Sequence, residues 1–468
     1  MLTPQELMGK YVAALNERRW YDVIEHTTEI IKKNDTIAHV WANRAAALGQ
    51  LGQNVDAILS VDRAIALEAS AKHFANKGCF YWNIGNAKKA LAYLHESVAI
   101  EPLAQAKLTM GNIYKYEGKL NKALHCYRES VAIDPEYADG HLVLAMTLLK
   151  MGQLQEGWKE YEWRWKTDQL PPRKLPCPRW AGEDLTNKTI LVYGEQGLGD
   201  MLQFARYTAT LAQQFPRAKI ILEGKPHVRR LFETLPDVYA VINAGDKLPH
   251  LDYAIPLMSL AGALTPNISA IVNHEIEYFL NPVDVENWGE RFNQLPEGFR
   301  VGVCWSGMAR TENPHADAVD KLRSTTLSEF APLAKIPGIT WISLQKGPAA
   351  EQIKAPPSGM TIVDMTDEML DFYDTCCAIH NCDLVISVDT AVLHAAASIG
   401  VPTWLLSRWD GCWRWFGDRA DSPWYPSLRQ FVQPAPHNWP GLMNDVKGKL
   451  ADLVKNKDTL EFDLTLAK

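Results

Sequence analysis

The stretch LGQNVDAILSVDRAIAL, residues 51–67, recurs as IGNAKKALAYLHESVAI at 84–100 and as EGKLNKALHCYRESVAI at 117–133. Its glycine returns every 33 residues, at Gly52, Gly85 and Gly118, and Gly152 follows after 34. An alanine stands five residues after each of the first three glycines. Each copy predicts a helix, a tight turn at the glycine and a second helix, and the small alanine lets the two helices approach closely.

An earlier, degenerate copy precedes these three. One period before Gly52, Arg19 and Ile24 take the places of the glycine and the alanine. Proline after Glu101 and after Asp134 ends two of the later copies, because proline cannot continue the helix before it. Period, glycine, alanine and proline together resemble the tetratricopeptide repeat family, with about four units over residues 5–165. Such arrays leave a concave face that commonly binds peptides or proteins, although an array can also only cap or dimerise a chain.

Aromatic residues and prolines mark the end of the array. Trp158, Tyr161, Trp163 and Trp165 have helical spacing, which predicts a packing seam against the next domain rather than a ligand site. The segment LPPRKLPCPRW at 170–180 predicts an extended connector. We therefore assign residues 1–165 to the repeat array and 166–187 to a Pro-rich connector.

Composition limits the partners and the compartment. The 468 residues carry 48 Lys and Arg against 55 Asp and Glu, a net charge of −7. Proteins that bind nucleic acid through its phosphates usually have a basic excess, so a nucleic-acid partner is not expected. Eight cysteines without a CxxC pair are typical of idle thiols in a reducing compartment. We find no signal-peptide pattern and no apolar run of about 18 residues, so we expect a cytoplasmic protein without a membrane span.

From residue 188, short apolar strands alternate with helical stretches. NKTILVYGEQGLGDMLQFARYTATLAQQF at 187–215 reads as strand, glycine-rich turn and helix, and DLVISVDTAVLHAAASIGVPTWLL at 383–406 as strand, helix and strand. This alternation predicts parallel sheets with right-handed crossovers. We expect one lobe over 188–285 and a second over 286–468 that ends in a helix, with ligands bound beyond the carboxyl ends of the strands.

Several segments in this region resemble a glycosyltransferase family. They are GEQGLGD at 194–200, CWSG at 304–307, SLQKG at 343–347, SVDTAVLHAAASIGVPTW at 387–404 and DSPWYPSLRQF at 421–431. In this order they resemble bacterial heptosyltransferase-like enzymes of two-lobed GT-B architecture. Joined to the repeats, the arrangement is similar to the O-linked N-acetylglucosamine transferases. The expected fold class is tetratricopeptide helical repeats followed by a two-lobed GT-B (double Rossmann-like) α/β region, with the acceptor in the first lobe and a nucleotide sugar in the second.

The segment SVDTAVLHAAASIG predicts an anion site. A strand that ends at Val388 and a helix that begins near Asp389 or Thr390 would turn free backbone N–H groups and the positive end of the helix dipole toward a diphosphate. Thr390 and the amide of Ala391 are the candidates for direct contact. His394, one turn on, faces either the ligand or the interior. In similar families this segment holds the phosphates or the ribose of the donor, which implies a binding role for Asp389 and Thr390.

The segment GEQGLGD is a candidate for the catalytic base. Its glycines allow close approach to a ligand, but GxxGxG is not the GxGxxG fingerprint of dinucleotide sites, so NAD is not expected. An acceptor hydroxyl must lose its proton as it attacks the anomeric carbon, so a transferase needs a base. The resemblance implies that Asp200 is this base, and Glu195 is the second candidate. The alternative role of Asp200 is a simple helix cap.

Further polar residues suit a departing diphosphate, which needs cations and N–H donors placed in advance. Each cation, taken alone, is more typical of a solvated surface. The resemblance implies that Gln345 contacts the base of the nucleotide through its side-chain amide or its backbone. The candidates that follow strands are Ser306, Gly307, Lys321, Arg323, Gln345 and Lys346.

The loop SRWDGCWRWFGDRADSPWY at 407–425 is rich in Trp and Arg. Trp409, Trp413 and Trp415 either stack on a base or sugar or form an aromatic plug, and Arg414 can pair with a phosphate. The sequence has no DxD motif, the nearest string being Asp284-Val285-Glu286, and no histidines at ligand spacing. We expect no metal and no cofactor besides the donor substrate.

These observations lead to one expected function and its alternatives. We expect a metal-independent, inverting transferase that moves a sugar from a nucleotide-diphosphate donor to a hydroxyl of a protein or peptide held by the repeats. The alternatives are a saccharide or lipid-linked acceptor and a catalytically inactive repeat scaffold. A homodimer is possible through the outer helices of the array. One departure from the similar families is the pair Cys376 and Cys377, which replaces small alanines.

Overall fold

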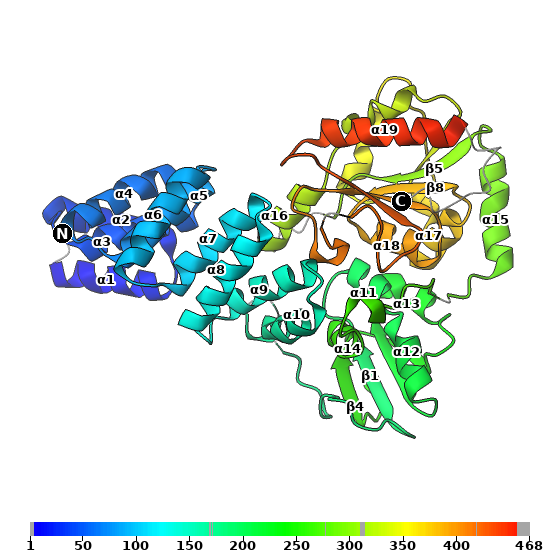
Figure 1. Cartoon of the computed structure of the whole chain (residues 1–468), viewed down its shortest axis with the longest axis horizontal. Helices are drawn as coiled ribbons and strands as arrows, with labels where there is room; N and C mark the ends of the chain where they lie inside the picture. Colours follow the sequence, from blue (N-terminus) through cyan, green and yellow to red (C-terminus); the bar gives the residue numbers. More distant parts are fainter. Residues whose placement is uncertain are drawn as a thin grey trace. The chain divides into compact units, whose positions relative to one another are not determined.

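The computed structural model describes residues 4–455 except 168–169, 171, 277, 309–313 and 418. It divides into two compact units (Figure 1). The first unit comprises residues 1–148 and 160–169 and holds most of the repeat array. The second comprises residues 149–159 and 170–468 and holds the α/β region.

Ten α-helices precede the first strand in the described part of the chain. They lie in five consecutive pairs, where about four units were expected. The helices are α1 (Pro4–Asn16), α2 (Trp20–Lys33), α3 (Ala38–Gln50), α4 (Asn54–Leu67), α5 (Ala71–Asn83), α6 (Ala87–Ile100), α7 (Ala104–Tyr116), α8 (Leu120–Ile133), α9 (Ala138–Lys150) and α10 (Leu154–Tyr161).

The recurring glycines close the first helix of the last four pairs. Gly52, Gly85, Gly118 and Gly152 have φ values of 76°, 78°, 75° and 76°, a left-handed conformation that L side chains rarely adopt. After Gly52 the backbone N–H of Gln53 donates to the carbonyl of Leu48, over 2.9 Å. This bond satisfies a carbonyl that the helix end would otherwise leave unpaired, so glycine recurs because the turn geometry requires it.

The first pair has the same turn, displaced by one residue from the predicted place. Arg18, with φ 56°, occupies the position of the glycine, and the N–H of Arg19 donates to the carbonyl of Ala14 over 2.9 Å. Val23 is fully buried at the position of the alanine, and Ile24 is only partly buried. The predicted alignment of Arg19 and Ile24 is therefore wrong by one residue, because the first repeat is 34 residues long.

The aromatic residues at the end of the array divide between the two units. Trp158 packs edge-on against Phe204 and Trp413 of the α/β region, with ring centroids 6.3 and 5.3 Å away. Trp163 instead stacks on His141 inside the array, with centroids 3.8 Å apart. The other two rings flank a buried guanidinium within the array. Trp158 therefore packs against the α/β region as predicted, within the second unit, and Trp163 packs on His141 within the first.

The α/β unit contains two all-parallel sheets in the described residues. Sheet A has the order β3-β2-β1-β4 and sheet B the order β10-β9-β8-β5-β6-β7. The strands are β1 (Thr189–Tyr193), β2 (Lys219–Gly224), β3 (Ala240–Asn243), β4 (Tyr253–Pro256), β5 (Phe299–Cys304), β6 (Ile339–Ser343), β7 (Ile362–Asp364), β8 (Leu384–Val388), β9 (Thr403–Ser407) and β10 (Leu428–Val432).

Helices connect these strands and cover both sheets. They are α11 (Leu198–Phe204), α12 (Tyr207–Gln214), α13 (Pro226–Phe232), α14 (Leu257–Leu264), α15 (Pro282–Asn293), α16 (Pro314–Arg323), α17 (Phe372–Ile379), α18 (Ala391–Ser398) and α19 (Trp439–Lys455). Cys376 and Cys377 are fully buried on α17, and burial raises the pKa of the Cys377 thiol to about 12. The predicted fold class, helical repeats followed by a two-lobed, double Rossmann-like α/β region, is confirmed.

Strand order creates a switch point in each sheet. In sheet B the chain runs from β5 to β6 and β7 on one side and from β8 to β9 and β10 on the other. The central pair β5 and β8 is in register, with Cys304 beside Ser387 at the carboxyl end. In sheet A the corresponding pair is β1 and β4. Loops after such strands diverge, which is where ligands bind in open α/β sheets.

The connector lies along the edge of sheet A. The N–H of Trp180 donates to the carbonyl of Ala254 over 2.9 Å, and the N–H of Ala254 donates to the carbonyl of Pro178 over 3.0 Å. Farther back, Arg173 donates to both carboxylate oxygens of the buried Glu223, over 2.5 and 2.7 Å. The connector is therefore extended where it pairs with β4, and it covers an edge that would otherwise be open to pairing with other chains.

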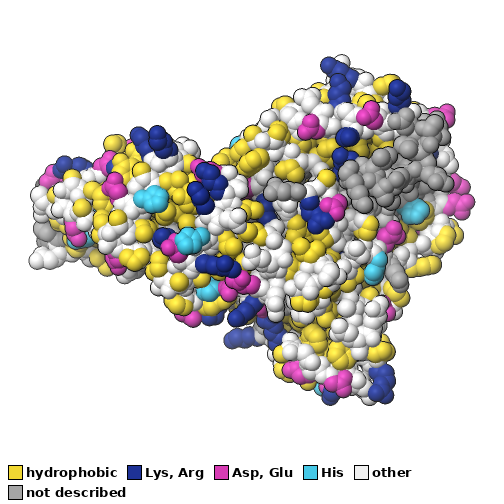
Figure 2. Space-filling model, viewed as in Figure 1, with side chains coloured by type: hydrophobic (Ala, Val, Ile, Leu, Met, Phe, Trp, Pro, Cys, Tyr) yellow, Lys and Arg dark blue, Asp and Glu magenta, His cyan; other side chains and the backbone are white. Residues whose placement is uncertain are grey.

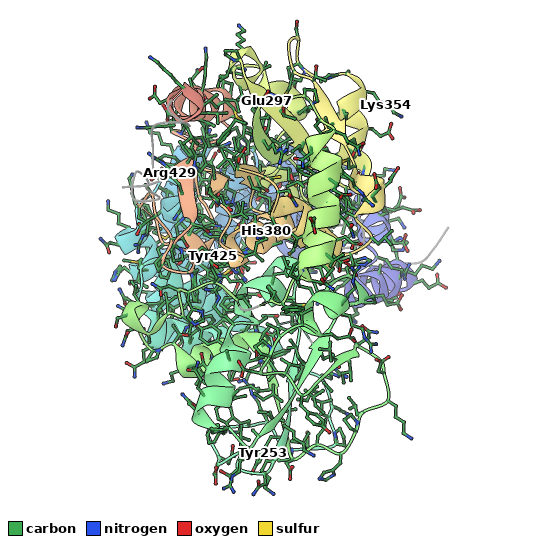
Figure 3. The ribbon with its side chains drawn as sticks, turned by 90° about the vertical axis from the view of Figure 1, so that its right-hand side faces the viewer. Tyr253, Glu297, Lys354, His380, Tyr425 and Arg429 are labelled. Carbon is green, nitrogen blue, oxygen red and sulfur yellow. The ribbon has the colours of Figure 1, made fainter. Side chains whose placement is uncertain are left out.

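Figure 3 shows the two lobes one above the other, with Tyr253 of β4 in one lobe and Glu297 and Lys354 in the other. Tyr425 lies near the level at which the lobes meet (Figure 3). A buried arginine joins them there. Arg206, which follows α11, donates to the carbonyl of Trp424 over 2.6 Å, and its guanidinium lies 4.6 Å from the centre of the Tyr425 ring.

Charged residues are interspersed over the face drawn in Figure 2, and the described residues visible there form no continuous basic stripe. This distribution agrees with the acidic net charge of −7. Among the described helices, none is both long and apolar enough to cross a lipid bilayer.

Candidate functional site

The amino end of α18 lies at the switch point of sheet B. Thr390, extended at φ −131° and ψ 172°, stands directly before the helix. Its hydroxyl does not cap the helix; its oxygen lies 3.0 Å from Oγ of Ser387 and 3.7 Å from Sγ of Cys304. The side chain of Thr390 thus points back into the sheet, so the amino end of α18 has no side-chain cap from this residue.

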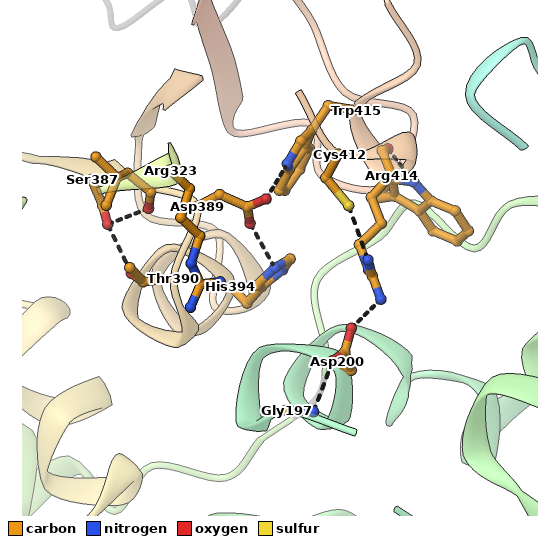
Figure 4. A network of polar contacts seen from close by, with 12 residues as sticks. Gly197, Asp200, Arg323, Ser387, Asp389, Thr390, His394, Cys412, Arg414 and Trp415 are labelled. Carbon is orange, nitrogen blue, oxygen red and sulfur yellow. Dashed lines mark hydrogen bonds and ion pairs between the residues drawn. The ribbon is translucent and has the colours of Figure 1, made fainter. Parts of the chain in front are cut away.

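Asp389 is an ionised carboxylate next to this helix end (Figure 4). Trp415 Nε1 donates to one carboxylate oxygen over 3.1 Å, and His394 Nε2 lies 3.7 Å from the other. Burial alone would raise the pKa of Asp389, but contact with His394, the charge of Arg323 and the Trp415 bond outweigh it and hold the pKa well below its ordinary value. A negative carboxylate repels phosphate, so this side chain suits hydroxyl groups of a ribose or sugar rather than the diphosphate.

His394 packs in the interior. Its Nδ1 is 2.9 Å from the hydroxyl of Tyr425, and its ring stacks on Trp415 with centroids 5.4 Å apart. The opposite lobe comes close to the same ring, because a Cβ added to Gly199 would lie only 2.7 Å from Cδ2 of His394. Of the two roles left open by the sequence, the structure favours packing. Gly199, in the glycine-rich segment, is the residue that lets α11 approach α18.

Asp200 uses its two carboxylate oxygens differently (Figure 4). One oxygen accepts the backbone N–H of Gly197 over 2.9 Å and caps α11. The other accepts from the guanidinium of Arg414, which belongs to the second lobe. The Asp200 side chain is about one-fifth exposed, at 19%. The capping role is therefore present, and it occupies only one of the two oxygens, while the other is paired with Arg414. Glu195 is partly buried in the loop between β1 and α11.

Gln345 fastens the loop that follows β5. Its Oε1 accepts the backbone N–H groups of Trp305 and Ser306 over 3.1 and 2.8 Å. Its Nε2 donates to the carbonyls of Ser306 and Lys346 over 3.1 and 2.8 Å. The side chain is 2% exposed. Because the amide is occupied by these backbone groups, the predicted contact between Gln345 and a nucleotide base is left to its backbone.

Arg323 and Gly307 form the neighbouring part of the site. Arg323 donates to Asp320 over 3.0 and 2.7 Å, and its charge acts on Asp389. A Cβ added to Gly307 would lie 2.1 Å from Oδ1 of Asp320, so glycine is required where the loop crosses this ion pair. Ser306 donates from its hydroxyl to the carbonyl of Gly307 over 3.1 Å.

The two predicted lysines are engaged elsewhere. Lys321 is 77% exposed and pairs with Asp317 over 2.7 Å. The ammonium group of Lys346 donates to the carbonyl of Met369. Arg323 is therefore the candidate cation that the structure brings to the Asp389 cluster, and the role of either lysine in binding a donor stays a prediction.

The Trp-rich loop is mainly packed. Trp413 and Trp415 are buried, at 5% and 2% exposure, and their side chains support the plug interpretation. Trp409 is only partly buried. Sequence reasoning did not predict the partners of Tyr425 and Arg206, because a single buried arginine after a short helix has no pattern of its own. The segment DSPWY, which carries Tyr425, was recognised only by resemblance.

No group of three or more His, Cys, Asp and Glu side chains suited to a metal ion occurs among the described residues. The string Asp284-Val285-Glu286 lies on α15, where Asp284 accepts a hydrogen bond of 2.9 Å from the hydroxyl of Tyr373.

Comparisons with known proteins identify the repeats. A family model described as TPR repeat matches residues 111–152. Protein FlbA of Caulobacter vibrioides is 26% identical over 339 residues, which are 66% of this chain and 54% of FlbA. This chain therefore spans about half the length of that curated relative.

Two solved structures resemble separate parts of the chain. The ADP-heptose lps heptosyltransferase II of E. coli is 14% identical with a TM-score of 0.41, over 56% of this chain and 99% of that one. MamA of Desulfovibrio magneticus RS-1 is 20% identical with a TM-score of 0.29, over 34% of this chain and 90% of that one. From the matched family model and the helical pairs, we conclude that the chain carries tetratricopeptide repeats ahead of its two α/β lobes.

Proposed function

We propose that this chain is a metal-independent, inverting glycosyltransferase that moves a sugar from a nucleotide-diphosphate donor to a hydroxyl of an acceptor. The observation that carries the proposal is the amino end of α18, which Thr390 leaves uncapped at the switch point of sheet B. Helix α11, which bears Asp200, packs against this same helix from the other lobe. The proposed anion site and the proposed base therefore lie on two helices that pack together from the two lobes.

The proposal assigns the diphosphate of the donor to α18. Backbone amides at a helix amino end and the helix dipole favour a doubly charged leaving group. Arg323 adds a positive charge close to Asp389. Asp389 itself accepts hydrogen bonds from hydroxyl groups of the ribose or the sugar. No cofactor besides the donor substrate is part of the proposal.

The chemistry is a single displacement. The acceptor oxygen forms a bond to the anomeric carbon on the face opposite the leaving group. The bond from that carbon to the diphosphate oxygen breaks, and its electron pair leaves with the nucleoside diphosphate. The proton of the acceptor hydroxyl passes to Asp200, with Glu195 as the second candidate. One displacement with one base inverts the configuration at the anomeric carbon.

The acceptor is proposed to be a protein or peptide held by the repeats, since tetratricopeptide arrays commonly bind such partners. A saccharide or lipid-linked acceptor is the alternative within the same chemistry, and a repeat scaffold without catalysis is the alternative outside it. The heptosyltransferase-like motifs and their combination with repeats support a transferase activity over a scaffold without catalysis.

The first experiment is a thermal-shift panel with UDP, GDP, ADP, CDP and dTDP, with and without Mg²⁺. A nucleotide at about 100 times its Kd adds about 2.7 kcal/mol, a shift of a few degrees. A selective shift that does not depend on Mg²⁺ is expected. The absence of any shift from folded protein would favour the scaffold.

The second experiment measures turnover of the Asp200→Asn variant. We expect a loss of about 10²–10⁴-fold with nucleotide binding retained, because a general base contributes about that much. Asp371→Asn is the matched control, since Asp371 caps α17 by accepting the N–H groups of Tyr373 and Asp374. Unchanged turnover in Asp200→Asn would remove Asp200 as the base.

A further inference from the structure

The proposed base is held by an arginine from the opposite lobe. The guanidinium of Arg414 pairs with Oδ1 of Asp200, and the two side chains are only 10% and 19% exposed. They are 214 residues apart in the sequence. The guanidinium occupies the oxygen of Asp200 to which an acceptor hydroxyl would have to hydrogen-bond, so the pair blocks the approach of the acceptor to the base.

The backbone of Arg414 is held in place, and its guanidinium lies 4.5 Å from the centre of the Trp413 ring and 5.8 Å from that of Phe204. Trp413 and Trp415, on either side of Arg414, are both buried. The carbonyl of Arg414 accepts the Nε1–H of Trp424 over 2.8 Å. Its NH1 group lies 3.0 Å from Sγ of Cys412. The packed loop thus presents one long side chain, which has several rotatable bonds, to the opposite lobe.

The same loop reaches the proposed donor site. Trp415, the next residue, donates to Asp389, which stands two residues before the start of α18. Figure 4 shows Arg414 reaching to Asp200, with the Asp389 and Trp415 pair beside it on the left. A diphosphate at α18 would present more negative charge and more acceptor oxygens to a guanidinium than one carboxylate does.

We propose that Arg414 is a donor-operated latch on Asp200. Without donor, the guanidinium occupies the carboxylate; when a nucleotide diphosphate binds at α18, the guanidinium turns to the phosphates and Asp200 is released to accept the proton of the acceptor. The latch rests on the proposed function and gives its order of events, in which the donor binds before the base becomes available. It also joins the two lobes in a way that responds to the ligand.

A double-mutant cycle on nucleotide binding tests the latch. Titration calorimetry of the whole chain with the nucleoside diphosphate selected by the thermal-shift panel gives Kd for the wild type, Asp200→Asn, Arg414→Gln and the double variant. In the wild-type background, removing the Asp200 charge frees Arg414, so Asp200→Asn is expected to tighten binding about tenfold. In the Arg414→Gln background the same change is expected to leave Kd unaltered.

Two further variants separate the latch from a structural role. Arg414→Lys keeps the charge and is expected to retain part of the coupling. Arg419→Gln, in the same loop, removes an arginine that pairs with Asp421 instead, so the effect of Asp200→Asn is expected to persist in it. An equal effect of Asp200→Asn with and without Arg414 would overturn the latch.

The cycle does not depend on turnover, so the two proposals can fail separately. Coupling in the cycle without transfer to any acceptor would uphold the latch and refute catalysis. Transfer without coupling would uphold the proposed function and refute the latch. Failure of every nucleoside diphosphate to bind the folded wild type would overturn both.

Discussion

Replacing Gly199 by alanine tests whether the two lobes meet as described. A Cβ at this position would lie 2.7 Å from Cδ2 of His394 and 3.6 Å from the Cα of Ala391 on α18. The imidazole has little room to retreat, because it contacts the hydroxyl of Tyr425 and stacks on Trp415. The new methyl group must therefore push α11 and α18 apart.

The magnitude follows from two opposing effects. Overpacking a well-packed interface costs about 1–3 kcal/mol. Alanine in place of glycine inside a helix gains up to about 1 kcal/mol. Gly448 on α19 provides the control, because a Cβ there would meet nothing within 4 Å. Gly448→Ala therefore carries the helix gain alone, and the difference between the two variants isolates the contact, at about 1–3 kcal/mol.

Hydrogen exchange measured by mass spectrometry on the whole chain gives the local free energy of opening of each helix. In Gly199→Ala the net cost is up to about 2 kcal/mol, which is the largest overpacking cost less the helix gain. Peptides that cover α11 and α18 are therefore expected to exchange up to about 30-fold faster than in the wild type, since 1.4 kcal/mol is a factor of ten. In Gly448→Ala, the α19 peptide is expected to exchange up to about fivefold more slowly. Slower exchange of α11 and α18 in Gly199→Ala would refute the close approach of these helices.

Three further predictions concern single positions. Arg18→Gly relieves a left-handed residue, so the pair α1 and α2 is expected to gain about 1 kcal/mol, measured by exchange of peptides from residues 4–33. Gln345→Leu leaves the buried backbone N–H of Trp305 without its acceptor and is expected to cost about 1–3 kcal/mol in denaturant unfolding. Asp389 has a lowered pKa in the folded state, so its stabilising contribution is present above the ordinary carboxyl pKa and is lost as pH falls through the folded value. The stability difference between the wild type and Asp389→Asn in thermal unfolding is therefore expected to shrink on acidification.

The outcomes that contradict these predictions are distinct. No change in exchange for Arg18→Gly would mean that its backbone is unstrained. Unchanged stability of Gln345→Leu would mean that the side-chain oxygen of Gln345 does not hold the β5 loop. If the stability difference between the wild type and Asp389→Asn grows as pH falls, then folding raises the pKa of Asp389 instead of lowering it.

The helical repeats could be predicted from the sequence because their signal is local. A left-handed turn needs glycine, and glycine at a fixed period needs no knowledge of distant residues. The same reasoning failed at Arg18, where an arginine adopts the turn and the spacing is one residue longer. The first helix pair does contain the turn, but because no glycine marks it, the residue that forms it is known only from the backbone angles of the structure.

The order of strands and helices could be predicted from the sequence for the same reason, whereas the candidate site could be predicted only in part. The carboxyl ends of β5 and β8 could be located, but their adjacency is a property of sheet order, which the alternation of elements does not specify. The pairing of Asp200 with Arg414 joins residues on different lobes. The occupied amide of Gln345 depends on a loop from another strand. Such contacts are set by tertiary packing, and no local pattern encodes them.

The repeated turn also bears on how the array can change length. Gly52 and Gly85 have nearly equal φ values, and each is followed by the same closing hydrogen bond. An in-frame loss of residues 52–84 would join Leu51 to Gly85 and recreate the same turn at the junction. Gene recombination between copies can therefore shorten or lengthen the array by whole hairpins while the two lobes keep their sequence.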